Sequence, residues 1–169
     1  MCAAGSQEVI RRLGPADAAD VARLAREARA AAIPNLPDLH TPAQDIAFYR
    51  RQITTSIGFC FEEGGTIAGF ALGQDHMLEH LYVAPASQRR GIGTLLLECM
   101  AEALQGGSLR LWTFQSNYGA ISFYRRHGFT VIDQTDGSGN EEGLPDYLLE
   151  RIWSRSDAVK GRVRTQWPA

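Results

Sequence analysis

The stretch from Leu81 to Leu97 has residue types and spacing that suit a site for an anion. It opens with the bulky, β-prone residues 81–83, which predict the end of a strand. Pro85 stops that strand, a loop with two arginines and two glycines follows, and apolar residues take helical spacing from Thr94 onward. Glycines let a backbone approach a ligand closely, and the free N–H groups of a first helical turn attract negative charge. We therefore expect this loop to bind a pyrophosphate.

Glycine spacing separates the families that place glycines in such a loop. A P-loop needs Lys-Ser or Lys-Thr after its last glycine, and the chain contains neither pair. A dinucleotide fingerprint needs a third glycine where this chain has Leu96, and seven residues separate Val83 from Gly91. The remaining run, Gln88-Arg89-Arg90-Gly91-Ile92-Gly93, resembles the Q/R-x-x-G-x-G/A signature of the GNAT superfamily of acyl-CoA-dependent N-acyltransferases.

This resemblance implies a co-substrate, acetyl-CoA, and a reaction, direct attack of a primary amine on its thioester in a ternary complex without a metal. The strand that ends at 81–83 should splay from its parallel neighbour and leave backbone groups free to bind pantetheine and polarise the acyl carbonyl. The residues expected to contact acetyl-CoA are Leu81, Tyr82, Val83, Gln88, Arg89, Arg90, Gly91, Ile92, Gly93, Thr94, Asn117, Ala120 and Tyr124.

A second segment, 117–129, looks like the N-x-x-A-x-x-F-Y-x-x-x-G-F segment of the same superfamily. The resemblance gives Asn117 a contact with the cofactor and makes the Tyr124 hydroxyl a general acid near the thioester sulfur. A thiolate leaving group is stabilised by a proton donor, and a helix is rigid enough to aim one. The alternative is that Tyr124 only packs in the core with Phe123 and Phe129.

An amine must lose a proton before it can attack, so a base or a water path to one is required. Glu79 is the main candidate, because it lies two residues before Leu81 in an otherwise apolar strand, and alternation would put both on one face. Asp75 and His80 are further candidates. The competing interpretation of Glu79 is a salt bridge at the edge of the sheet.

The resemblance implies that the first two helices and the last strands recognise the acceptor. The residues expected there are His40, Phe48, Glu79, Glu141, Glu142 and, at the end of the same acidic run, Asp146. Acidic side chains would suit a cationic amine, although a solvated polar loop explains them equally well. The arginines of the first helix, Arg23, Arg26 and Arg29, are expected on its solvated face.

Two other functions compete with an acetyltransferase. Residues 76–80 match the zinc motif H-x-x-E-H. That motif needs both histidines on one helical face, whereas in the expected strand they would be about 13 Å apart and could not share a metal. The second competitor is a non-catalytic module that binds acyl-CoA, which the sequence excludes less well.

Composition narrows the class of protein. The chain has 169 residues, a formal net charge of −2 and 21% charged residues, which indicates a globular domain rather than a nucleic-acid binder. No apolar run approaches membrane-spanning length, and no CxxC pair is present, so we expect a cytoplasmic protein with its apolar-patterned cysteines, Cys60 and Cys99, buried as thiols.

Hydrophobic periodicity predicts the elements that position these residues. Strands are expected at 8–13, 56–62, 66–74, 77–83, 109–114, 129–134 and 146–153, and helices at 17–30, 41–53, 91–104 and 117–127. This order resembles the GNAT fold, an α/β (α+β) domain with a mixed sheet of about seven strands flanked by helices and splayed between strands 4 and 5. The domain is expected at 8–154 with a tail at 155–169. The acceptor, a small-molecule amine or a peptide or protein amine, stays open, as does formation of a homodimer, which is common among proteins of this fold.

Overall fold

The computed structural model describes residues 8–104 and 107–153; the expected tail, 155–169, lies outside the described residues. The strands are β1 (Glu8–Arg12), β2 (Ile57–Glu63), β3 (Thr66–Gln74), β4 (Met77–Val83), β5 (Ser108–Phe114), β6 (Thr130–Thr135) and β7 (Asp146–Ile152). The helices are α1 (Ala18–Ala32), α2 (Pro42–Thr55), α3 (Ile92–Leu104) and α4 (Tyr118–Arg126), with 3-10 turns η1 (Pro15–Asp17) and η2 (Pro85–Ser87). Every expected helix and strand is confirmed, with ends that match or differ by at most two residues.

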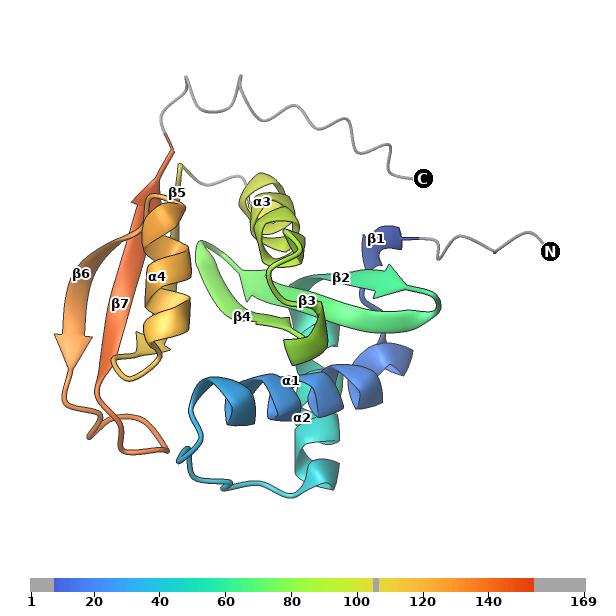
Figure 1. The fold of residues 1–169 in the computed structure, drawn as a ribbon, viewed down its shortest axis with the longest axis horizontal. Coiled ribbons are helices and arrows are strands. Elements are labelled where there is room, and N and C mark those ends of the chain that lie inside the picture. The colour runs from blue at the N-terminus through green and yellow to red at the C-terminus, as the bar shows by residue number, and fades with distance from the viewer. Residues whose placement is uncertain (1–7, 105–106, 154–169) are drawn as a thin grey trace.

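One seven-stranded sheet runs through the molecule in the order β1-β2-β3-β4-β5-β7-β6. β1 to β4 pair antiparallel, and β5, β7 and β6 form a second antiparallel group. The groups meet where β4 runs parallel to β5, and that pairing is limited to one position, Met77 opposite Arg110. Beyond it the strands diverge, so the expected splay is confirmed (Figure 1).

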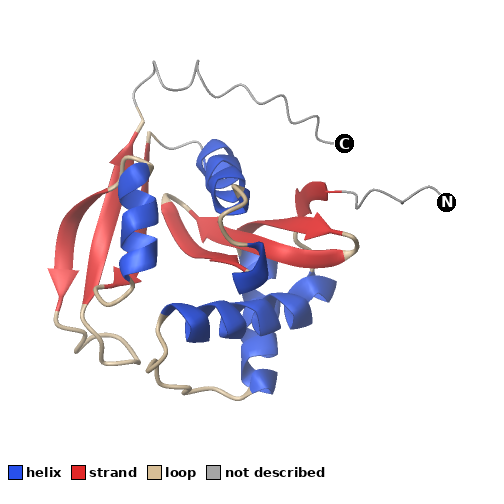
Figure 2. Ribbon diagram, in the orientation of Figure 1, coloured by secondary structure: helices blue, strands red, loops and turns tan. Residues whose placement is uncertain are grey.

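Helices cover both faces of the sheet and enclose two apolar clusters (Figure 2). The buried face of α1, formed by Val21, Leu24, Ala25 and Ala28 as expected, packs with α2 and with Phe70 of β3. The other cluster joins α3 and α4 to the opposite face of the sheet. Alternation along the strands separates the clusters, since neighbouring residues of a strand point to opposite faces.

Local signals set the ends of the helices near the site. Thr41 caps α2 through a capping box with Gln44, and Pro42 takes the first helical position, as the sequence predicts. At α4, the Asn117 side chain accepts a hydrogen bond from the Ala120 N–H, and Gly128 follows the helix with a φ of +82°. Such caps fix where α4 starts and therefore which side chains it aims at the sheet.

Two further properties follow from the described part of the chain. Cys60 and Cys99 are buried free thiols, as expected. None of the helices in residues 8–104 and 107–153 has both the length and the apolar character to cross a membrane.

Candidate active site

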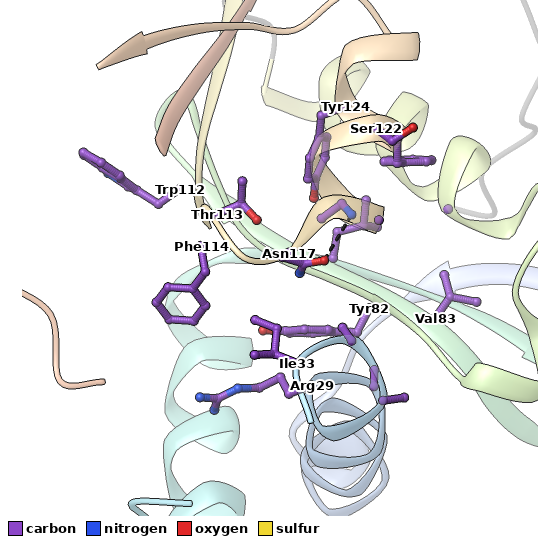
Figure 3. A pocket seen from close by; sticks show the side chains of 18 of the residues that line it. Arg29, Ile33, Tyr82, Val83, Trp112, Thr113, Phe114, Asn117, Ser122 and Tyr124 are labelled. Carbon is purple, nitrogen blue, oxygen red and sulfur yellow. Dashed lines mark hydrogen bonds between the residues drawn. The ribbon is translucent and has the colours of Figure 1, made fainter. Parts of the chain in front are cut away.

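A cavity of about 1310 Å³ occupies the splayed junction between β4 and β5. One part is lined by the end of β4, the loop into α3, the end of β5 and one face of α4; the other part is lined by the end of α1 and the loop between β6 and β7. Figure 3 shows Tyr124 of α4 and Asn117, which caps α4, above Tyr82 of β4, with Phe114 of β5 to one side and Arg29 of α1 below. The cavity therefore collects residues from both halves of the sheet.

The loop into α3 has the backbone that anion binding requires. Gly91 has a φ of +86°, a conformation that side chains with a Cβ rarely adopt. Gly93 faces Phe123 of α4, and a Cβ built on it would lie 3.4 Å from that ring. Glycine therefore leaves the space between the α3 loop and α4 open. Arg89 lines the cavity without an ion-pair partner among the described residues, next to the N-terminus of α3. The loop therefore combines free N–H groups with a positive charge.

Arg90 is placed differently from its neighbour. Its guanidinium binds both carboxylate oxygens of Glu63 at 2.8 Å and reaches Glu8 at 3.2 Å. The pairing with Glu63 keeps the pKa of that carboxyl below its usual value. Arg90 is absent from the cavity lining, whereas all the other residues expected to contact acetyl-CoA line it. Arg90 thus ties the loop to the β2–β3 hairpin.

Tyr124 lies at the junction of the cavity and the core. Its ring is 7% exposed and packs edge-on against Phe129, with ring centroids 5.4 Å apart. Burial, together with the neighbouring Tyr82, raises the pKa of Tyr124 well above its ordinary value. The hydroxyl therefore keeps its proton at neutral pH and faces a cavity where it could donate it (Figure 3).

Glu79 does not line the cavity. Its carboxylate accepts hydrogen bonds from Ser56 at 3.1 Å and from Gln74 at 3.0 Å, both at the opposite end of β4. The alternation used to place it fails because the β3–β4 ladder has a bulge there: Leu72 pairs with His80, but Gly73 pairs with Leu78. A catalytic role for Glu79 stays a prediction, which the pH profile of Glu79→Gln would test.

The two other base candidates also lie off the cavity. Asp75 is in the β3–β4 turn with a φ of +45°. His80 packs among the rings of Phe48, Tyr49 and Tyr82, and burial lowers the pKa of His80 to about 4. The neutral imidazole is half-buried and stacks on the ring of Tyr82, with ring centroids 6.1 Å apart.

Of the residues expected to recognise the acceptor, some form contacts away from the cavity and others line it. Glu141 pairs with His40 at 2.9 Å, and neither lines the cavity; Phe48 packs on His80 instead. Glu142 lines the cavity and pairs at 2.7 Å with Arg29 of α1.

Arg29 corrects the expectation of a solvated arginine face on α1. It points into the cavity and joins α1 to the β6–β7 loop, and Arg26 of the same helix pairs with Asp45 and Asp38. Spacing along one helix could not reveal these partners, because they come from segments far along the chain. The one signal in the sequence was Glu142, an acidic residue that could balance the charge of Arg29.

The H-x-x-E-H segment lacks the geometry of a zinc motif. His76 lies in the β3–β4 turn and His80 in strand β4, so the two are not one helical turn apart. Within the described residues, no group of three or more His, Cys, Asp or Glu side chains is arranged to hold a metal ion.

Comparison with known proteins agrees with this geometry. Residues 55–131 match the model of the acetyltransferase (GNAT) domain family. The chain is 35% identical over 90 residues to the peptidyl-lysine N-acetyltransferase YiaC of Escherichia coli (strain K12), a match that covers 53% of this chain and 59% of that protein's length.

Two solved structures share the fold over most of their length. A GCN5-related N-acetyltransferase from Rhodopseudomonas palustris superimposes with a TM-score of 0.74 at 18% identity, covering 90% of this chain and 100% of that one. YncA from Salmonella typhimurium, solved with acetyl-CoA, superimposes with a TM-score of 0.66 at 23% identity, covering 88% of this chain and 95% of that one. The chain thus shares its fold with these acetyltransferases, and its residues 55–131 match the acetyltransferase (GNAT) domain family.

Proposed function

We propose that the protein is an N-acetyltransferase that moves an acetyl group from acetyl-CoA to a primary amine by direct attack in a ternary complex. The observation that carries this proposal is one cavity that joins the α3 loop, the unpaired end of β4 and the Tyr124 hydroxyl. An anion site for the cofactor, a backbone site for the acyl group and a proton donor for the sulfur serve a thioester acyl transfer, and the amine proton leaves through a base or a water path.

The cavity fits acetyl-CoA by the chemistry of its lining. The N-terminus of α3 and Arg89 suit the pyrophosphate, because both offer positive charge beside a loop that glycine leaves open. Backbone groups at Leu81 and Val83, which have no partner on β5, suit the amides of pantetheine and the acyl carbonyl. Asn117 lines the same space, and its side-chain oxygen is already used in capping α4.

When bound, acetyl-CoA supplies an activated acyl group on a thioester. The acceptor nitrogen would lose a proton to a base or a water path and attack the acyl carbon, and the carbon–sulfur bond would break as Tyr124 donates its proton to the departing sulfur. Backbone N–H groups of β4 would stabilise the charge that develops on the acyl oxygen. The matching segment of YiaC favours a lysine side chain among possible amines.

Release of free thiol from acetyl-CoA, followed against a panel of alkylamines, amino acids and lysine peptides, tests this function. We expect steady turnover with at least one amine, together with CoA binding by calorimetry. CoA binding without turnover on any amine would instead identify a non-catalytic acyl-CoA module. Mass spectrometry of the acceptor confirms that acetyl groups are transferred rather than lost to water.

A further inference from the structure

The charged side chains that line the cavity fall into a neutralised pair and three unpaired groups. Arg29 and Glu142 neutralise each other at 2.7 Å. Within residues 8–104 and 107–153, no carboxylate lies within ion-pair distance of Arg89 or Arg126, and no basic group lies within that distance of Asp146. The cavity therefore keeps two positive charges and one negative charge for its ligands.

These unpaired charges belong to different elements. Arg89 precedes α3 and Arg126 lies in the last turn of α4, where they suit the phosphates of CoA. Asp146 begins β7, opposite Phe114 at the end of β5, and follows the loop that Arg29 holds to α1. The negative charge thus stands on the acceptor side, formed by α1 and the β6–β7 loop.

Neighbouring groups hold the Asp146 carboxylate in one orientation. One oxygen accepts a hydrogen bond from the Thr135 hydroxyl at 2.5 Å, and the other accepts one from the Asn140 amide at 3.2 Å. Both donors are neutral, so the negative charge is fixed but not cancelled. Fixed, partly desolvated charges attract opposite charges more strongly than freely hydrated ones do.

We propose that Asp146 binds a cationic nitrogen of the acceptor other than the one that is acetylated. The acceptor class is then a primary amine with a second cationic nitrogen, as in an aliphatic diamine or in a lysine next to a basic residue. This inference rests on the proposed function and narrows its substrate.

The chemistry favours an anchor over a base. An ammonium ion held by Asp146 is no nucleophile, so a single amine bound there could not attack. With two nitrogens, one stays charged at Asp146 while the other loses its proton and reaches the acyl group near Tyr124. Glu142 cannot serve as this anchor, because Arg29 already occupies it.

Thiol release with matched acceptors tests the proposal. One arm compares 1,4-diaminobutane with n-butylamine and 5-aminopentanoate, and the other compares lysine peptides with a lysine or an alanine neighbour. We expect the acceptor with a second cationic nitrogen to exceed its match without one at least tenfold in kcat/KM in one arm, which identifies the source, and zwitterionic 5-aminopentanoate to be poorest.

Asp146→Asn should remove that preference by raising KM for the dicationic acceptor at least tenfold, with kcat nearly unchanged. Asp146→Glu should recover part of it. The matched control is Asp133→Asn on β6, whose side chain bonds, among residues 8–104 and 107–153, only to the Gln134 N–H and does not line the cavity. Equal turnover of acceptors with and without the second cationic nitrogen in both arms overturns the proposal, as does an Asp146→Asn enzyme that keeps the preference.

Calorimetry separates this proposal from the proposed function. If no amine is turned over, the N-acetyltransferase assignment fails, yet 1,4-diaminobutane should still bind the CoA-loaded protein and lose at least tenfold in affinity in Asp146→Asn. Absence of such binding overturns the anchor. Should Asp146→Asn not fold, the wild-type comparison of 1,4-diaminobutane, n-butylamine and 5-aminopentanoate decides the question alone.

Discussion

The Tyr124 hydroxyl combines two environments that seldom meet on one side chain. Its ring is held by Phe129 and Phe123 in the core, while its oxygen borders the cavity. Because burial raises its pKa, the phenol stays protonated across the pH range in which amines become nucleophilic. A buried proton donor held in one position suits this reaction, because the proton must reach the sulfur as the carbon–sulfur bond breaks.

Replacing Tyr124 with Phe keeps the packing and removes only the hydroxyl. We expect the chemical step to slow about a hundredfold, with thermal stability and CoA affinity nearly unchanged. Single-turnover thiol release, measured where chemistry is limiting, checks this. A Phe variant that keeps the wild-type rate would show that Tyr124 serves only the core.

His80 makes the stability of the fold depend on pH. Burial among aromatic rings lowers its pKa from 6.5 to about 4, so between these values the unfolded chain binds a proton that the native state excludes. The stability due to neutral His80 is complete above pH 6.5 and is lost as pH falls toward 4. We expect a loss of about 2 kcal/mol over this range, visible in urea unfolding.

The variant His80→Phe keeps a ring at this position and cannot titrate. Its unfolding free energy should change less between pH 6.5 and 4 than that of the wild type, after the shared acid effects of carboxylates are subtracted. Parallel curves for the two proteins would assign the acid sensitivity to other groups.

Residue types and the family resemblance together predicted which residues of the α3 loop and α4 line the cavity, apart from Arg90. Gly91, Gly93 and Tyr124 stand in local patterns whose physical meaning is the same wherever the chain folds them. Arg90 and Arg29 could not be placed this way, because a guanidinium binds whichever carboxylate the fold brings near. Their partners lie far away along the chain, at Glu63 and Glu142.

At the scale of elements, the space between α3 and α4 depends on the absence of a side chain at Gly93. Gly93 has no positive φ, so alanine fits its backbone, but the added methyl would stand 3.4 Å from Phe123. We expect Gly93→Ala to weaken CoA binding about tenfold, which is about 1.4 kcal/mol, with little loss of stability. Calorimetry against Gly14→Ala, a glycine outside the cavity, is the comparison; equal affinities would place CoA elsewhere.

Periodicity predicted the elements, because each buries one face at a repeat of 2 or 3.6 residues. It could not predict that β7 lies between β5 and β6, since strand order depends on pairing between segments far apart. Nor could it predict the bulge at Gly73, which breaks the alternation that the Glu79 hypothesis used. One extra residue in a ladder is invisible to a pattern that assumes perfect alternation.

At the scale of the whole molecule, two apolar clusters on opposite faces share the sheet as their common wall. Leu96 of α3 is fully buried, whereas its neighbour Leu95 is 37% exposed. We expect Leu96→Ala to lower the free energy of unfolding by about 2–5 kcal/mol and Leu95→Ala by under about 1 kcal/mol. Urea denaturation of both variants measures the difference, and similar losses would contradict the assignment of α3 to the core.

The single bridge between Met77 and Arg110 also has a mechanical meaning. Among the described residues, no continuous hydrogen-bond ladder joins β4 to β5. In the free protein, side-chain packing is therefore the main connection between the β5–β7–β6 group and strands β1 to β4. A pantetheine chain bonded to the free edges would act as a removable strand and stiffen the joint. We expect amide exchange along β5 to slow when CoA binds, so that rigidity rises and falls with each catalytic cycle.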